Sequence, residues 1–206
     1  MSDPAALVHL EIGGITRLVG RLYVTAARGR VETSTLVYDP SWVHAPDSFA
    51  LEPALTLSTA PHYTLPGRAL FGPMGDSAPD RWGQTLLRRD ERLRARDEGR
   101  TPRTLREIDF LLGVTDSVRQ GALRFTAAVD GPFVAPEGTG VPPLVELPRL
   151  LDASERFLAG EDSAEDLRLL LAPGSSLGGA RPKASVRDAS GALLIAKFPK
   201  RDDDDD

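Results

Sequence analysis

Apolar and polar positions alternate along the first part of the chain. Three segments rich in β-branched and aromatic residues are separated by glycine-containing turns, and they cover residues 7–12, 16–25 and 31–38. Within the third, every odd position is valine or threonine, a noisy period of two that is typical of a half-buried strand. Residues 51–59 and 121–127 predict shorter strands, and the prolines of residues 39–47 predict a loop. The first part of the chain therefore predicts an antiparallel sheet.

Four later segments have the spacing of amphipathic helices. Trp82, Leu86 and Leu93 fall on one helical face, with Ser77 as the expected N-cap and Asp80 three residues after it. Thr104 and Glu107 predict a second start, for a helix that ends near residue 113. Residues 147–158 form a third apolar face, and Ser163 with Asp166 predicts the cap of a fourth helix that ends at residues 173–174.

A stretch rich in proline and glycine, residues 130–143, divides the pattern. We expect an α+β fold, with an antiparallel, β-rich subdomain with helices over residues 1–129 and a second part over residues 130–206. The second part would contain the linker, two helices, a glycine-rich loop at 174–184 and a strand at 192–199.

Composition limits the protein class. The 206 residues include no cysteine, which excludes disulfides and thiolate metal sites. No apolar run reaches the roughly 18 residues of a membrane span, and residues 1–12 lack a signal-peptide pattern, so we expect a cytoplasmic protein with no membrane partner. The net charge of −5 comes from Asp202–Asp206. The three histidines are scattered and receive no role.

Positive charge gathers in one place. Residues 81–106 contain nine arginines and four acids. This could be a patch for nucleic acid or an acidic partner, but interspersed acids and the absence of an aromatic stacking pattern favour a solvated helix face.

The most informative segment is GSSLGGARPKA, Gly174 to Ala184. It ends at Lys183, which is the first of only three lysines in the chain. Glycines let backbone N–H groups surround an anion. The spacing excludes the Walker A and dinucleotide motifs. A glycine-rich loop followed by a strand lysine, Lys197, is found in protein kinases, but a flexible turn before a hairpin would give the same pattern.

Several segments together resemble the HipA family of bacterial serine/threonine kinase toxins. GSSLGGARPKA and IAKFP, residues 195–199, are similar to its nucleotide loop and lysine strand. LFGPMGDSAPDRWGQTLLR, residues 70–88, is similar to its D-S-x-P-D-x-W-G segment, and FLLGVTDSVRQGALRF, residues 110–125, to its D-x-x-R-x-G-A-L-R-F segment. With residues 20–40, the resemblance covers most of the chain.

The resemblance implies a kinase-like N-lobe in the second part and assigns a site to it. The residues that would bind ATP with Mg²⁺ are Ser176, Leu177, Gly178, Gly179, Ala180, Lys183 and Lys197. Lys197 matches the lysine that holds the ATP phosphates. Ser176 matches the autophosphorylated serine, whose phosphate shuts the kinase off and makes the family member a phosphoprotein. The resemblance also implies partners within a toxin–antitoxin system linked to persistence. One is a HipB-like helix-turn-helix antitoxin, through which alone DNA would be bound. The other is the substrate, an aminoacyl-tRNA synthetase or another translation protein.

The catalytic half of a kinase does not follow Lys197. No H-x-D-x-x-x-x-N or D-F-G motif is present, so we expect a chain truncated before the catalytic loop, with no catalytic residue and no metal ligand of its own. Weak or no ATP binding by the chain alone is expected, together with an exposed apolar surface. Two hypotheses stay open: part of a HipA-like kinase, or a non-catalytic module that docks on an antitoxin or on a separately encoded kinase. A decayed product without activity is a weaker third.

Overall fold

The computed structural model describes residues 4–25, 32–128, 131–133, 142, 144–174 and 181–199. In these residues the fold is mixed α+β, with a five-stranded antiparallel sheet, a two-stranded sheet and six α-helices. The chain divides into two compact units. Unit 1 comprises Met1–Ala78, Arg106–Leu112 and Gln120–Val134, and unit 2 comprises Pro79–Leu105, Gly113–Arg119 and Ala135–Asp206.

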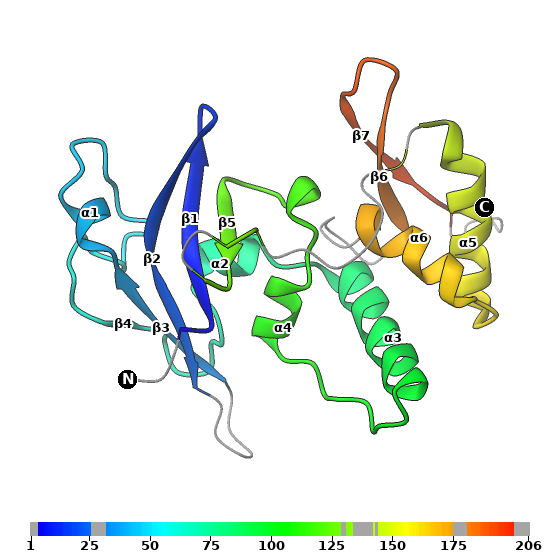
Figure 1. The fold of residues 1–206 in the computed structure, drawn as a ribbon, viewed down its shortest axis with the longest axis horizontal. Helices are drawn as coiled ribbons and strands as arrows, with labels where there is room; N and C mark the ends of the chain where they lie inside the picture. Colours follow the sequence, from blue (N-terminus) through cyan, green and yellow to red (C-terminus); the bar gives the residue numbers. More distant parts are fainter. Residues whose placement is uncertain are drawn as a thin grey trace, which may run out of the picture. The chain divides into compact units, whose positions relative to one another are not determined.

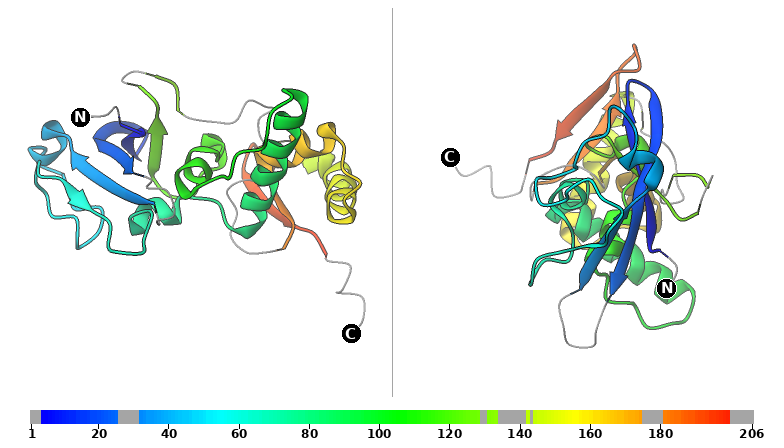
Figure 2. Two further views of the ribbon diagram at one scale, coloured as in Figure 1. Left: turned by 90° about the horizontal axis from the view of Figure 1, so that it is seen from below. Right: turned by 90° about the vertical axis from the view of Figure 1, so that its left-hand side faces the viewer.

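Unit 1 is built on the five-stranded sheet (Figure 1 and Figure 2). The strand order is β4-β3-β2-β1-β5, and the strands are β1 (Ala6–Ile12), β2 (Ile15–Thr25), β3 (Thr33–Tyr38), β4 (His62–Tyr63) and β5 (Leu123–Thr126). Every pairing is antiparallel, and the β1–β2 register shifts between Val8 and His9. The alternation in the sequence therefore predicted the central strands correctly.

Two glycine positions explain how the sheet forms. Gly13 and Gly14 have φ of +59° and +77°, which suits the two-residue turn between β1 and β2. Gly20 lies where β2 comes closest to β3, because a Cβ there would be 2.5 Å from the carbonyl oxygen of Val37. A side chain at residue 20 would therefore push the two strands apart.

Three short helices accompany this sheet, namely α1 (Pro40–Val43), α2 (Gly72–Asp76) and α4 (Glu107–Leu112). The core of the unit joins sheet and helix residues, among them Val8, Leu22, Leu36, Tyr38, Met74, Leu111 and Phe125, each fully buried. The hydroxyl of Tyr38 donates to the carbonyl of Leu55 at 3.2 Å and accepts from the N–H of Leu51 at 3.0 Å, so it ties the loop over residues 51–55 to the sheet.

Two local predictions in unit 1 are wrong. Residues 51–59 form turns rather than a strand, and the next strand is the two-residue β4. The expected loop at 39–47 contains α1, because the Asp39 side chain accepts the N–H of Ser41 and Pro40 suits the first helical position.

The described residues of unit 2 form three α-helices, two short 3-10 helices and the β6–β7 hairpin (Figure 1). The elements are α3 (Arg81–Asp97), α5 (Leu147–Ala159), α6 (Ala164–Gly174), β6 (Lys183–Arg187) and β7 (Leu193–Lys197). Helix α6 packs against α3, α5 and β6. It buries Leu167, Leu170 and Leu171, and Ala184 and Val186 of β6 are also fully buried.

The helix starts in unit 2 show which capping predictions hold. Ser163 and Asp166 form the expected box, since the Asp166 N–H donates to Ser163 Oγ at 3.1 Å and the Ser163 N–H donates to Asp166 Oδ2 at 3.0 Å. Helix α3 begins differently: Asp80 is its N-cap and accepts the N–H of Gly83 at 3.1 Å. Ser77 was predicted to be that cap, but it is the C-cap of α2.

The start of α4, in unit 1, also differs in detail from its prediction. The helix runs over Glu107–Leu112, and the N–H of Arg106 donates to Asp109 at 2.9 Å, so the side chain that caps the start of the helix is Asp109 rather than Thr104.

Among the described residues, no helix combines the length and the apolar character that a bilayer span requires.

Candidate functional site

The predicted nucleotide site divides into a part that the structure describes and a part that it does not. Ser176, Leu177, Gly178, Gly179 and Ala180 lie outside the described residues. Lys183 and Lys197 are both described, the first at the start of β6 and the second at the end of β7.

The two lysines are brought together by the hairpin. Lys183 and Lys197 are cross-strand partners in the β6–β7 register. Directly opposed residues of an antiparallel pair project from the same face, with Cβ atoms roughly 5 Å apart. Opposed like charges are destabilising unless anions accompany them. The geometry therefore places two positive charges where the hairpin begins and ends.

Lys183 is the buried member of this pair. Its side chain is 4% exposed, and Nζ lies 3.3 Å from Oδ2 of Asp80, whose side chain is 16% exposed. A desolvated ammonium group needs such a carboxylate, because burial of an unpaired charge is strongly unfavourable. Asp80 thus has two roles, as the N-cap of α3 and as the counter-ion of Lys183.

Trp82 fixes the backbone at the same point. Its indole N–H donates to the carbonyl oxygen of Lys183 at 3.0 Å, and its ring packs edge-to-face against Phe157 at 5.3 Å between centroids. Trp82 is 3% exposed, so its ring belongs to the core of unit 2. Two segments about 100 residues apart in sequence therefore meet through a side-chain ion pair and a buried hydrogen bond.

Sequence reasoning missed Asp80 as the partner of Lys183. It assigned Asp80 to the helix cap alone, since a cap is a local feature and an ion pair across 103 residues is not. The available signal was the first lysine of the chain, placed at the start of an apolar strand.

The sequence left the environment of Lys197 open. Alternation puts this lysine on one side of the strand with Leu193 and Ile195, where it could be partly desolvated or could reach into solvent. Lys197 is exposed, and Leu193, Leu194 and Ile195 are 49%, 41% and 57% exposed. The desolvated lysine of the hairpin is Lys183. An exposed apolar surface was expected in the chain, and the described part of β7 presents one.

The segment at residues 110–125 has a structural explanation. Asp116 and Arg119 lie at the two ends of a short 3-10 turn, with the Arg119 side chain fully buried and its Nη2 donating to the carbonyl of Val114 at 2.9 Å. The distance from Arg119 Nε to Asp116 Oδ1 is 3.8 Å. These two polar residues therefore stabilise the turn.

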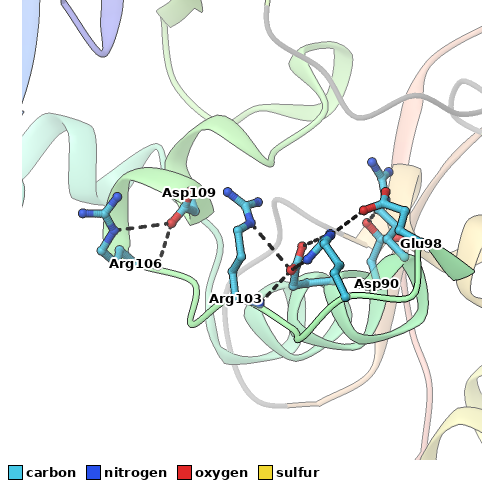
Figure 3. Close-up of polar contacts among 8 residues, drawn as sticks. Asp90, Glu98, Arg103, Arg106 and Asp109 are labelled. Atoms are coloured by element: carbon cyan, nitrogen blue, oxygen red, sulfur yellow. Dashed lines mark hydrogen bonds and ion pairs between the residues drawn. The ribbon is translucent and has the colours of Figure 1, made fainter. Parts of the chain in front are cut away.

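Several of the arginines in residues 81–106 are paired within unit 2 (Figure 3). The buried carboxylate of Glu91 accepts from Arg100 Nη1 at 2.5 Å and from the N–H of Arg103 at 2.8 Å. These hydrogen bonds lower the pKa of Glu91 to about 2, with that from Arg100 contributing most. Burial raises the pKa of Asp90, which lies next to Arg94. Part of the arginine-rich segment is therefore structural, as the interspersed acids indicated.

Within the described ranges, no cluster of three or more histidine, aspartate or glutamate side chains could hold a metal ion. What unit 2 offers instead is a pair of lysines, one neutralised by Asp80 and one exposed, on a hairpin that follows the glycine-rich segment. This arrangement can hold an anion next to Lys197. No protein-family model, curated protein or solved structure matches this chain.

Proposed function

We propose that the chain is the N-terminal portion of a HipA-like serine/threonine protein kinase and that its glycine-rich segment and two lysines contribute to an ATP site. In this proposal unit 2 contains the beginning of a kinase-like N-lobe. Its partners would be a HipB-like antitoxin and, as substrate, a protein of the translation apparatus.

The cross-strand pairing of Lys183 and Lys197 carries the proposal. Protein kinases place a lysine on a strand beside a glycine-rich loop, and in the active state this lysine is paired with a carboxylate while it contacts the nucleotide phosphates. Here Lys183 is paired with Asp80, whereas Lys197 is exposed and has no ion pair in the part of the chain that the structure describes. Of the two lysines, Lys197 is therefore the one available to a phosphate.

The chemistry of the preceding segment is compatible with this role. Residues 174–184 supply three glycines and Ser176 in front of the hairpin. A phosphate on Ser176 would carry a charge of roughly −1.5 to −2 and would compete with a nucleotide for the same lysine. Phosphorylation of Ser176 would accordingly act as an off-switch.

A second candidate function is supported by the exposed residues of β7. Leu193 and Ile195 project from one side of the strand and Leu194 from the other, and all three are exposed. Apolar side chains on both sides of a strand are typical of a strand that another protein segment covers. A docking module, which would bind an antitoxin or a separately encoded kinase, needs this surface and no nucleotide.

Calorimetric titration with Mg-ATP tests the proposal. We expect weak binding, with a Kd of about 1 mM or above. This corresponds to a binding free energy no more favourable than about −4 kcal/mol. Lys197→Met should abolish the binding. Arg187→Gln is the matched control, because Arg187 belongs to the same hairpin at the opposite end of the register.

Two results would count against the nucleotide site. Equal affinities of wild type and Lys197→Met would remove the proposed role of that lysine. Complete absence of a Mg-ATP signal would favour the docking module. A phosphotransfer assay tests that alternative in turn, because transfer of labelled phosphate by this chain alone is incompatible with a purely non-catalytic module.

A further inference from the structure

Strand β7 is the open edge of the hairpin in unit 2 (Figure 1). Helix α6 packs against β6, whose Ala184 and Val186 are fully buried. On β7, by contrast, Leu193, Leu194 and Ile195 are about half exposed. Among the described residues, no third strand pairs with the hairpin. An open apolar edge of this kind is a template on which another strand can pair.

The hydrogen-bond register shows which backbone groups of β7 point outward. The N–H of Phe198 donates to the carbonyl of Pro182 at 2.9 Å, one position beyond the end of β7. In an antiparallel pair, every second residue bonds across to its partner strand and the residues between them point away. The N–H and C=O groups of Leu193, Ile195 and Lys197 therefore point away from β6.

The outer edge of β6 is already used. The indole N–H of Trp82 donates to the carbonyl of Lys183 at 3.0 Å, and the N–H of Arg187 donates to the carbonyl of Pro142 at 2.9 Å. Within the described ranges, the outward groups of β7 make no such hydrogen bond. The hairpin thus has one open edge, so edge-to-edge pairing of two copies would end at a dimer and would not continue into a fibre.

The outward groups of β7 are spaced so that the strand complements itself. Antiparallel pairing about a two-fold axis at Ile195 places this residue opposite Ile195 of the second copy, and Leu193 opposite the second copy's Lys197. Opposed residues at these positions exchange both of their hydrogen bonds. The three outward residues of each copy would then form about six backbone hydrogen bonds between the two strands.

The same register suits the side chains. Leu194 lies opposite Ala196 of the second copy, and Lys197 lies opposite a leucine, which its aliphatic chain can cover while the ammonium group stays in water. An axis at Leu194 or Ala196 would pair only two of the three outward residues. An axis at Lys197 would oppose two ammonium groups, which is destabilising. The pairing about Ile195 is therefore the best of these registers for both hydrogen bonds and charge.

We propose that β7 is a homodimer interface, at which two copies of this chain join their hairpins into one four-stranded antiparallel sheet. The proposal rests on the docking role given above for β7, names a second copy as the partner, and is independent of the ATP site. Three half-exposed aliphatic side chains per copy make a small interface, below the roughly 1,200 Å² of total buried surface that is typical of stable complexes. The dimer is accordingly weak, with a Kd of about 100 µM.

Sedimentation velocity of the full chain, over a concentration series that brackets this Kd, tests the interface. We expect the sedimenting mass to rise from the 22.2 kDa of the monomer toward twice that value. Ile195→Lys would oppose two ammonium groups at the two-fold axis and should weaken association about tenfold or more. Ile15→Lys is the matched control, because Ile15 is also an isoleucine in a strand, is 60% exposed against 57% for Ile195, and belongs to unit 1.

Cysteine variants test the register itself, because the chain contains no cysteine. The Cα atoms of a hydrogen-bonded antiparallel pair are about 5.5 Å apart, which suits a disulfide. Ile195→Cys should therefore give a disulfide-linked dimer on mild oxidation. Leu193→Cys is the matched control on the same face of the strand. Its two copies would be offset by four positions, roughly 14 Å along the strands, so it should cross-link about tenfold more slowly or less.

Three results would overturn the proposal. A chain that stays monomeric well above the expected Kd would show that β7 does not pair with itself. Equal association of wild type and Ile195→Lys would place any contact elsewhere. Equal oxidation rates of Ile195→Cys and Leu193→Cys would indicate random collision. Circular dichroism verifies that the variants fold, as their exposed positions lead us to expect, and the Mg-ATP titration is read separately, so the dimer and the ATP site can fail independently.

Discussion

The ion pair between Asp80 and Lys183 allows a quantitative prediction. At 3.3 Å and an effective dielectric constant of about 20, the attraction is about 5 kcal/mol, and desolvation of both groups offsets part of it. Asp80→Asn keeps an oxygen that can cap α3 but leaves the Lys183 ammonium, 4% exposed, without its counter-ion. We expect a loss of about 3–5 kcal/mol in the free energy of unfolding, as for other broken buried pairs.

The reverse change should cost less. Lys183→Met replaces the buried ammonium by an apolar group, and Asp80 keeps the N–H of Gly83 and a more exposed position. A loss of roughly 1–2 kcal/mol is expected. Combining the two substitutions removes both charges, so the double variant should be more stable than Asp80→Asn alone, with a coupling energy of about 2–3 kcal/mol.

Urea denaturation followed by circular dichroism and tryptophan fluorescence measures these differences. Asp80→Ala is the control for the cap, and it should cost about 1 kcal/mol more than Asp80→Asn. The hydrogen bond from Trp82 is made to the backbone of Lys183 and survives in every variant. A loss below about 1 kcal/mol in Asp80→Asn, with additive effects in the double variant, would refute a buried, coupled pair.

Three further predictions concern stability in both units. Gly20→Ala should cost about 2 kcal/mol because its Cβ would lie 2.5 Å from a backbone oxygen of β3, whereas Gly75→Ala, whose Cβ meets nothing within 4 Å, should be nearly neutral in a urea titration. Glu91 has a folded-state pKa of about 2, lowered from 4.5 chiefly by Arg100, so the stability that its charge contributes is present above about pH 4.5 and is lost as the pH falls toward 2. After allowance for screening by solvent, this contribution to the free energy of unfolding amounts to about 1–2 kcal/mol. Glu91→Gln should remove this part of the acid transition. Ser163→Ala removes half of the capping box of α6 and should lower the free energy of unfolding by about 1 kcal/mol in the same assay.

Local patterns predicted most of the elements because the information is itself local. The period-two segments became β1, β2 and β3, and the box of Ser163 and Asp166 begins α6. The errors have local causes too. Ser77 and Asp80 are both good capping residues three positions apart, and only the path of the chain after α2 decides that Asp80 caps α3.

The environment of the hairpin lysines could not be predicted in this way. Alternation put Lys197 on one side with Leu193 and Ile195, and the structure keeps that alternation but exposes all three side chains. Whether a strand face is covered depends on what packs against it, and no residue within the strand specifies this.

The sequence by itself determined the α+β composition, the strands β1, β2 and β3, the helices α3, α5 and α6, and the two lysines of the β6–β7 hairpin. Tertiary structure alone decided that Lys183 is buried against Asp80 and that Lys197 is exposed. The physical reason is the distance along the chain over which each interaction acts. Backbone propensity and capping act over a few residues, whereas the burial and pairing of a charge depend on groups that folding brings from about 100 positions away.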